Sequence, residues 1–196
     1  FKLISVDRGK VVESAATLAS DINSKAKLVA GPRSILLVVR RETRTWESKT
    51  HATLKIRLAD LALKFNMTLA EYFGSEDEKK TLDLFQRAAA VVMYHGAAYA
   101  NVAFMQLGSV AVEITTYTTS NGIDSANKSS SWRNNALGKL KWLRPDITAL
   151  IYHVPFAVAY PHLDVSVLDN IHDPDRWIKA HGGVSLNTAD VDNLVE

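Results

Sequence analysis

Three groups of residues that could contact a ligand stand at the ends of short apolar segments. They are the arginines Arg40 and Arg41, the turn His95-Gly96-Ala97, and the lone charge Glu113. Guanidinium groups bind phosphate oxygens in pairs, and the N–H groups at a helix start bind them as well. A carboxylate at the end of a parallel strand can accept hydrogen bonds from two ribose hydroxyls. Together these residue types permit the binding of a nucleoside diphosphate.

Each of the three groups also has a structural interpretation. Arg40 and Arg41 can form a solvated basic rim at a strand end. Gly96 can simply make a tight turn beside a hydrogen-bonded His95. Glu113 can pair with an arginine from a neighbouring loop. Spacing alone leaves the ligand-binding and the structural interpretations open.

Other kinds of catalytic site find no support in the sequence. The chain has no cysteine, which excludes disulfides, thiolate metal ligands and a cysteine nucleophile. Its six histidines show no HxH or HExxH spacing, so no metal site is predicted. No serine stands in the GxSxG context of a nucleophile elbow.

The spacing of apolar residues predicts strands that alternate with helices. Strands are predicted at 35–39, 90–94, 109–114 and 147–154, with a short strand within 66–73 and a strand extension at 156–160. Helices are predicted at about 11–27, 51–64, 98–105, 132–143 and 175–180. A capping box at Ser75 and Glu78 predicts the start of one more helix.

This alternation predicts an α/β fold, a Rossmann-like parallel sheet with helices on both faces. The chain is predicted to form a single domain over 1–196, with a long exposed loop at 115–131 that is rich in serine, threonine and asparagine. In such sheets ligands bind beyond the carboxyl ends of the strands. All three groups of candidate residues fall at those ends.

Composition fits one ordinary soluble domain, with 47% hydrophobic and 22% charged residues. The net charge of +2 is too balanced to indicate a nucleic-acid partner. No apolar run approaches the roughly 18 to 20 residues that cross a bilayer. Because the chain begins at Phe1 and no signal segment follows, we expect its natural start to be missing.

The segment 84–114 resembles the signature of the family-61 glycosyltransferases. In that family a strand is followed by His-Gly-Ala-Gly-Leu-x-Asn, an apolar helix, a Pro-Gly-type turn and a strand that ends in Glu-Ile. Here the motif reads His-Gly-Ala-Ala-Tyr-Ala-Asn from His95 to Asn101, and the later strand ends in Glu113 and Ile114. The resemblance covers about residues 33–155.

The family transfers a sugar, with inversion, from a nucleotide sugar to a glycan or a protein hydroxyl. The donor is usually a uridine diphosphate (UDP) sugar, and the architecture is the two-domain GT-B fold. The resemblance implies that this chain corresponds to the C-terminal, donor-binding half, and that an N-terminal domain or a partner chain completes the enzyme. It also implies no cofactor besides the donor, and a place in the lumen of the Golgi or the endoplasmic reticulum.

The resemblance further implies roles for individual residues. In these roles Arg40 and Arg41 face the diphosphate, and His95, Gly96 and Ala97 contact it through backbone and imidazole. Glu113 holds the ribose, and Asn101 fixes the turn. Uridine is implied by the family alone, and no residue is identified as a catalytic base.

Three positions depart from the family pattern. Ala98 replaces the second glycine of the motif, Tyr99 replaces an aliphatic residue, and Tyr94 stands where a proline or a small residue often precedes the histidine. A Cβ atom at position 98 and a ring at position 99 are expected to narrow the diphosphate cradle. The alternative interpretation is therefore a non-catalytic descendant of the domain, retained as a structural subunit of a larger assembly, for example in an organelle.

Overall fold

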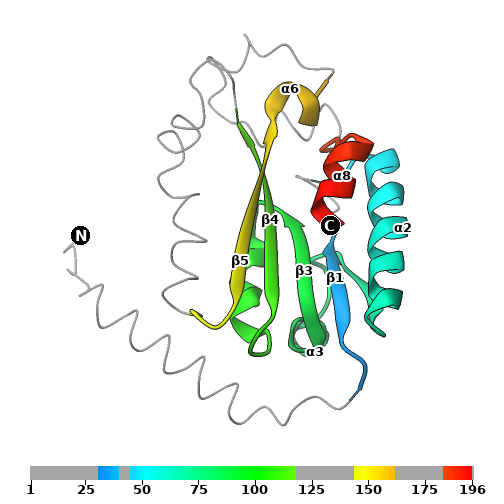
Figure 1. Cartoon of the computed structure of the whole chain (residues 1–196). Coiled ribbons are helices and arrows are strands. Elements are labelled where there is room, and N and C mark those ends of the chain that lie inside the picture. Colours follow the sequence, from blue (N-terminus) through cyan, green and yellow to red (C-terminus); the bar gives the residue numbers. More distant parts are fainter. Residues whose placement is uncertain (1–30, 40–44, 118–143, 162–182, 196) are drawn as a thin grey trace, which may run out of the picture.

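Five parallel strands form the centre of the molecule in a computed structural model, which describes residues 31–39, 45–117, 144–161 and 183–195 (Figure 1). The strands lie in the order β2-β1-β3-β4-β5, and every neighbouring pair is parallel. Their bounds are β1 Ser34–Val38, β2 Thr68–Tyr72, β3 Ala88–Tyr94, β4 Val110–Tyr117 and β5 Thr148–Pro155. The predicted α/β, Rossmann-like sheet is confirmed.

The order of the strands creates one point at which the direction of winding reverses. From β1 the chain passes to β2 on one side and then returns to β3 on the other. The connections that leave the carboxyl ends of β1 and β3 therefore lead to opposite faces, and ligands bind at such a point in many sheets of this kind. These carboxyl ends point upward in Figure 1.

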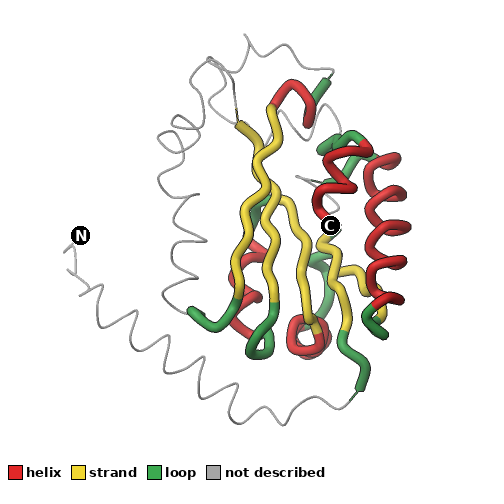
Figure 2. Tube along the Cα trace, in the orientation of Figure 1, coloured by secondary structure: helices red, strands yellow, loops and turns green. Residues whose placement is uncertain are grey.

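Helices cover both faces of the sheet, as the sequence predicts. On one face α2 (Ser48–Lys64) packs beside α8 (Thr188–Val195), and Figure 2 shows the two helices side by side. On the other face α3 (Glu78–Arg87) packs against η1 (Ala97–Phe104), a 3₁₀ helix. A four-residue helix, α6 (Phe156–Ala159), follows β5.

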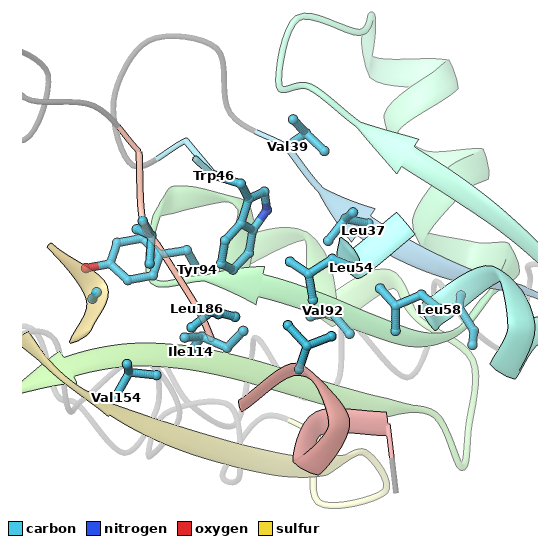
Figure 3. Close-up of a cluster of buried hydrophobic side chains, with 14 of the residues drawn as sticks. Leu37, Val39, Trp46, Leu54, Leu58, Val92, Tyr94, Ile114, Val154 and Leu186 are labelled. Carbon is cyan, nitrogen blue, oxygen red and sulfur yellow. The ribbon is translucent and has the colours of Figure 1, made fainter. Parts of the chain in front are cut away.

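Two hydrophobic cores lie on opposite faces, because successive residues of a strand point to opposite sides. Ile35, Leu37 and Val92 belong to the first core, under α2 (Figure 3), while Leu36 and Val91 belong to the second, under α3 and η1. Both sets are buried. This double burial explains why the strand sequences read as continuous apolar runs.

The helix at residues 78–87 begins at a different cap from the one predicted. Its N-cap is Asp77, whose Oδ1 accepts a hydrogen bond of 2.8 Å from the backbone N–H of Lys80. The predicted capping box on Ser75 is wrong by two residues. Glu76, in between, instead accepts a bond of 3.0 Å from the backbone N–H of Phe73 and so closes the preceding turn.

Three other boundaries also differ from the predictions. The helix expected at 98–105 is 3₁₀ rather than α, because its buried residues Tyr99, Val102 and Met105 recur every third position, the period of that helix. The expected extension of β5 at 156–160 is helical, since Pro155 ends the strand and cannot donate to a ladder. Residues 115–117, predicted to open a loop, continue β4.

Several predicted elements lie outside the described residues. These are the helices at 11–27, 132–143 and 175–180, the rest of the polar loop at 118–131, and the arginines Arg40 and Arg41. Within the described part of the chain, no helix is long and apolar enough to span a membrane.

Candidate functional site at the carboxyl edge of the sheet

The candidate turn begins at the end of β3, at the point where the direction of winding reverses. The backbone N–H of His95 still donates a bond of 3.0 Å to the carbonyl of Ile114, so His95 extends the ladder between β3 and β4 by one residue. Gly96 then forms the N-cap of η1. The strand ladder thereby fixes the backbone at this turn.

His95 and Glu113 meet directly. Glu113 lies opposite Met93 in the register of β3 and β4, and its Oε1 contacts the Nδ1 atom of His95. The His95 side chain is 11% exposed and the Glu113 side chain 2%. The structural interpretation of Glu113 expected an arginine as its partner, and the structure has a histidine there instead. Sequence spacing did not link these residues, which lie 18 positions apart.

Tyr99 adds a third polar group to this buried cluster. Its hydroxyl is buried and, among the described residues, has no hydrogen-bond partner. Burial raises the pKa of Tyr99 well above its usual value, and the negative charge of Glu113 raises it further. The ring packs in the second core with Val102 and Met105. The ring that the sequence led us to expect at the diphosphate site is thus largely buried.

The start of η1 offers backbone donors rather than a special glycine. Gly96 has φ 169° and ψ −177°, an extended conformation that any residue adopts. The first internal bond of the helix, 3.1 Å, runs from the N–H of Tyr99 to the carbonyl of Gly96. The N–H groups of Ala97 and Ala98 precede that bond and have no acceptor within the helix. Ala97 is exposed, so this end of η1 can meet a solute.

Asn101 links η1 to the end of β2. Its Nδ2 donates a bond of 3.4 Å to the hydroxyl of Tyr72, the last residue of β2. The Tyr72 ring packs edge-on against Phe85 of α3, with 5.3 Å between the ring centroids. Asn101 thus positions the helix against two other elements, which extends the turn-fixing role that the resemblance implies for it.

A buried arginine holds the other end of η1. The Arg144 guanidinium donates to the carbonyls of Ala103 and Met105 at 2.5 and 2.8 Å, and to the carboxylate of Asp146 at 2.6 Å. The hydrogen bonds from Arg144 lower the pKa of the Asp146 carboxyl. The sequence pattern predicted a helix ending at residue 143 and assigned Arg144 no role. An arginine just before a strand, with an aspartate two residues later, was the available signal.

Aromatic side chains fill the first core at the same edge. The Tyr94 ring meets the Trp46 ring edge-on, with 6.2 Å between the centroids, and its hydroxyl accepts a bond of 3.3 Å from the Tyr160 hydroxyl. Trp46 Nε1 donates to the carbonyl of Val38 at 2.9 Å. Figure 3 shows Trp46 and Tyr94 converging from separate elements. Tyr94, a departure from the family motif, is therefore held as part of a core.

A cavity of about 330 Å³ opens at the start of α2. Its walls carry hydroxyl, amide and charged side chains together with a few apolar ones: Glu47, Lys49, Thr50, Thr53, Val158, Pro161, Ser185, Leu186, Asn187 and Thr188. Glu47 already caps the helix, with its Oε2 accepting a bond of 3.0 Å from the N–H of Thr50. Backbone hydrogen bonds from Lys49 and Thr50 lower the pKa of Glu47. A carboxylate thus occupies the end of α2 where an anion would bind.

The structure brings together His95, Gly96, Ala97 and Glu113 of the predicted site, with Asn101 in support. Arg40 and Arg41 follow β1 in the sequence and lie outside the described residues. The described part of the chain contains no cluster of three or more histidine, aspartate or glutamate side chains that could hold a metal ion.

Comparison with known proteins adds little to this geometry. No protein-family model matches the chain, and no curated protein matches it. Among solved structures, it is similar to a small COPII coat GTPase of Encephalitozoon cuniculi in complex with GDP. The identity is 13%, 88% of this chain and 89% of that chain are covered, and the TM-score is 0.36. A similarity this low indicates nothing about the ligand, and the fold assignment stands on the sheet itself.

Proposed function

We propose that this domain binds a nucleotide-diphosphate sugar, most simply a UDP-sugar, and belongs to an inverting glycosyltransferase that acts on a glycan or protein hydroxyl. The observation that carries the proposal is the buried contact between His95 and Glu113. It lies where β3 ends beside β4, next to the exposed start of η1 and within the segment that resembles the family-61 motif. Core packing alone does not call for an imidazole and a carboxylate at this point.

The chemistry of such a donor fits the groups at this edge. When the anomeric C–O bond breaks, negative charge develops on the departing diphosphate. The N–H groups of Ala97 and Ala98 would stabilise that charge, with the His95 ring beside them. Arg40 and Arg41 would add guanidinium groups from the end of β1. The base that takes the acceptor proton would come from an N-terminal domain or a partner chain.

The proposal includes a compartment and leaves one alternative. An enzyme of this class would work in the lumen of the Golgi or the endoplasmic reticulum. The alternative, a non-catalytic subunit of a larger assembly such as an organellar complex, is favoured by Tyr94. Its ring packs on Trp46 and its hydroxyl accepts a bond from Tyr160, so this departure from the motif strengthens the core.

Calorimetric titration with UDP tests the proposal. We expect the wild-type protein to bind UDP with micromolar affinity and Arg40→Ala to weaken binding at least tenfold, because one phosphate contact is lost. Arg57→Ala is the matched control, since Arg57 pairs with Asp192 at 2.5 Å on α2 and α8 and is not part of the proposed site. Folded wild-type protein that shows no heat at millimolar UDP would overturn the enzyme proposal and favour the structural subunit.

A further inference from the structure

We infer that Glu113 is a positioning residue that acts through His95, rather than a residue that holds the ribose. Its carboxylate accepts a hydrogen bond from Nδ1 of His95 and so fixes the orientation and the protonated nitrogen of that ring. This inference rests on the proposed function for its ligand, and it changes the role that the family resemblance implies for Glu113.

Burial makes direct contact between Glu113 and a ribose unfavourable. The Glu113 side chain is 2% exposed and lies on the second-core face of β4. Its Oε1 already contacts the imidazole of His95. A ribose hydroxyl could reach the carboxylate only if the residues that bury it moved away.

The neighbouring polar groups do not replace His95 in this role. From η1, the Tyr99 hydroxyl lies near Glu113 and is buried without a hydrogen-bond partner among the described residues. From β5, His153 faces the same side of the sheet as Glu113, but its Nδ1 is hydrogen-bonded to Thr115 Oγ1 at 2.9 Å. The hydrogen bond that the structure gives to the Glu113 carboxylate comes from His95.

The contact has a definite consequence for the imidazole. An ionised carboxylate can only accept hydrogen bonds, so the nitrogen that faces it must carry a proton. The partner of one ring nitrogen sets both the tautomer and the ring plane of a histidine. With Nδ1 held in this way, a diphosphate at the start of η1 meets the His95 ring in one fixed orientation. Loss of this contact would weaken the hold on the ring orientation and so reduce that interaction.

Two measurements on the same variants test the inference. Nitrogen-15 spectra of the histidine rings report which nitrogen of His95 is protonated, and titration reports the affinity for UDP. In the wild type we expect Nδ1 of His95 to be protonated. Glu113→Met, which keeps the volume but removes the acceptor, should lose this signature and bind UDP about tenfold more weakly. Glu113→Gln, whose amide oxygen can still accept, should retain most of both.

Two further variants complete the test: Glu113→Asp, which has a shorter acidic side chain, and Glu71→Gln, which changes a distant carboxylate. If Glu113→Met fails to fold, Glu113→Asp withdraws the carboxylate by one methylene and should lose the same ring signature. The control is Glu71→Gln on β2, which should change neither measurement. Unprotonated Nδ1 in the wild type overturns the inference, as does a Met or Asp variant that keeps both the ring signature and UDP affinity within about twofold. Wild-type protein that does not bind UDP overturns the proposed function instead, and the ring signature still decides the role of Glu113.

Discussion

Among the described residues there are two histidine–glutamate contacts, one on each face of the sheet. In the first, His51 of α2 contacts Glu71 of β2 at 2.6 Å, and Lys55 reaches the same carboxylate at 2.9 Å. Its His51 and Glu71 side chains are 26% and 21% exposed. In the second, between His95 and Glu113, the corresponding values are 11% and 2%. The same two residue types therefore meet in very different surroundings.

The two contacts also differ in where their histidines lie. Both glutamates lie within paired strands, Glu71 opposite Leu37 and Glu113 opposite Met93, but His51 belongs to α2, which covers Glu71. His95 comes after the last residue of β3, at the edge where ligands bind in sheets of this kind. Water can solvate the first pair in part, whereas the second pair is almost fully buried. The comparison indicates that burial and position, rather than residue type, distinguish a contact that only stabilises the fold from one at a candidate site.

The largest difference between the pairs should appear when each glutamate is truncated. Glu113→Ala removes the buried carboxylate that contacts the His95 imidazole and opens a cavity, so we expect a loss of about 3–5 kcal/mol in the free energy of unfolding. Glu71→Ala should lose at most about 1 kcal/mol, as partly exposed ion pairs do. Urea unfolding followed by circular dichroism measures both. Equal losses in the two variants would contradict the comparison.

A second prediction concerns the unpaired hydroxyl beside Glu113. Tyr99→Phe removes a buried polar group that has no partner among the described residues, so we expect the free energy of unfolding to rise by about 1–2 kcal/mol. Tyr72→Phe is the matched control, because the Tyr72 hydroxyl accepts from Asn101 and its loss should cost about 1 kcal/mol. A destabilised Tyr99→Phe would mean that the hydroxyl has a partner in solution.

The sheet and its two cores were largely predictable from the sequence. Runs such as Ile35 to Val39 can be buried on both faces only in a parallel sheet, and the spacing of Leu54 and Leu58 marks the buried side of α2. Boundaries were less predictable because they depend on local competition. Asp77 rather than Ser75 caps the helix, because Glu76 belongs to the preceding turn, where it accepts the backbone N–H of Phe73.

The candidate site was predictable by residue but not by contact. Strand ends and residue types single out His95 and Glu113, yet their pairing depends on the register of β3 against β4, which the sequence does not state. The anchoring of η1 by Arg144 depends on β5 returning beside β4, and it was missed for the same reason. Contacts between distant segments follow from register and packing, which local patterns do not encode.

The smallest effect should come from titrating the exposed pair. Partial burial raises the pKa of the Glu71 carboxyl, but the hydrogen bonds from Lys55 and His51 outweigh it and hold that pKa below its ordinary 4.5. The folded protein therefore binds this proton less readily than the unfolded chain does. Stability from Glu71 is fully present above about pH 4.5 and is lost as the pH falls through the lowered value.

Glu71→Gln should consequently cost less than about 1 kcal/mol at pH 6, and the difference from wild type should shrink as the pH falls toward 3. Added salt at about 1 M should reduce it too, since screening weakens partly exposed charges. Urea unfolding at pH 6, 4.5 and 3 measures the trend. Asp60→Asn, which removes an exposed carboxyl on α2, is the control. Salt should leave the Glu113→Ala loss nearly unchanged, because water and ions do not reach a side chain that is 2% exposed. If salt weakened both pairs equally, burial would not be what distinguishes them, and the case for a special role of the His95 pair would lose its physical basis.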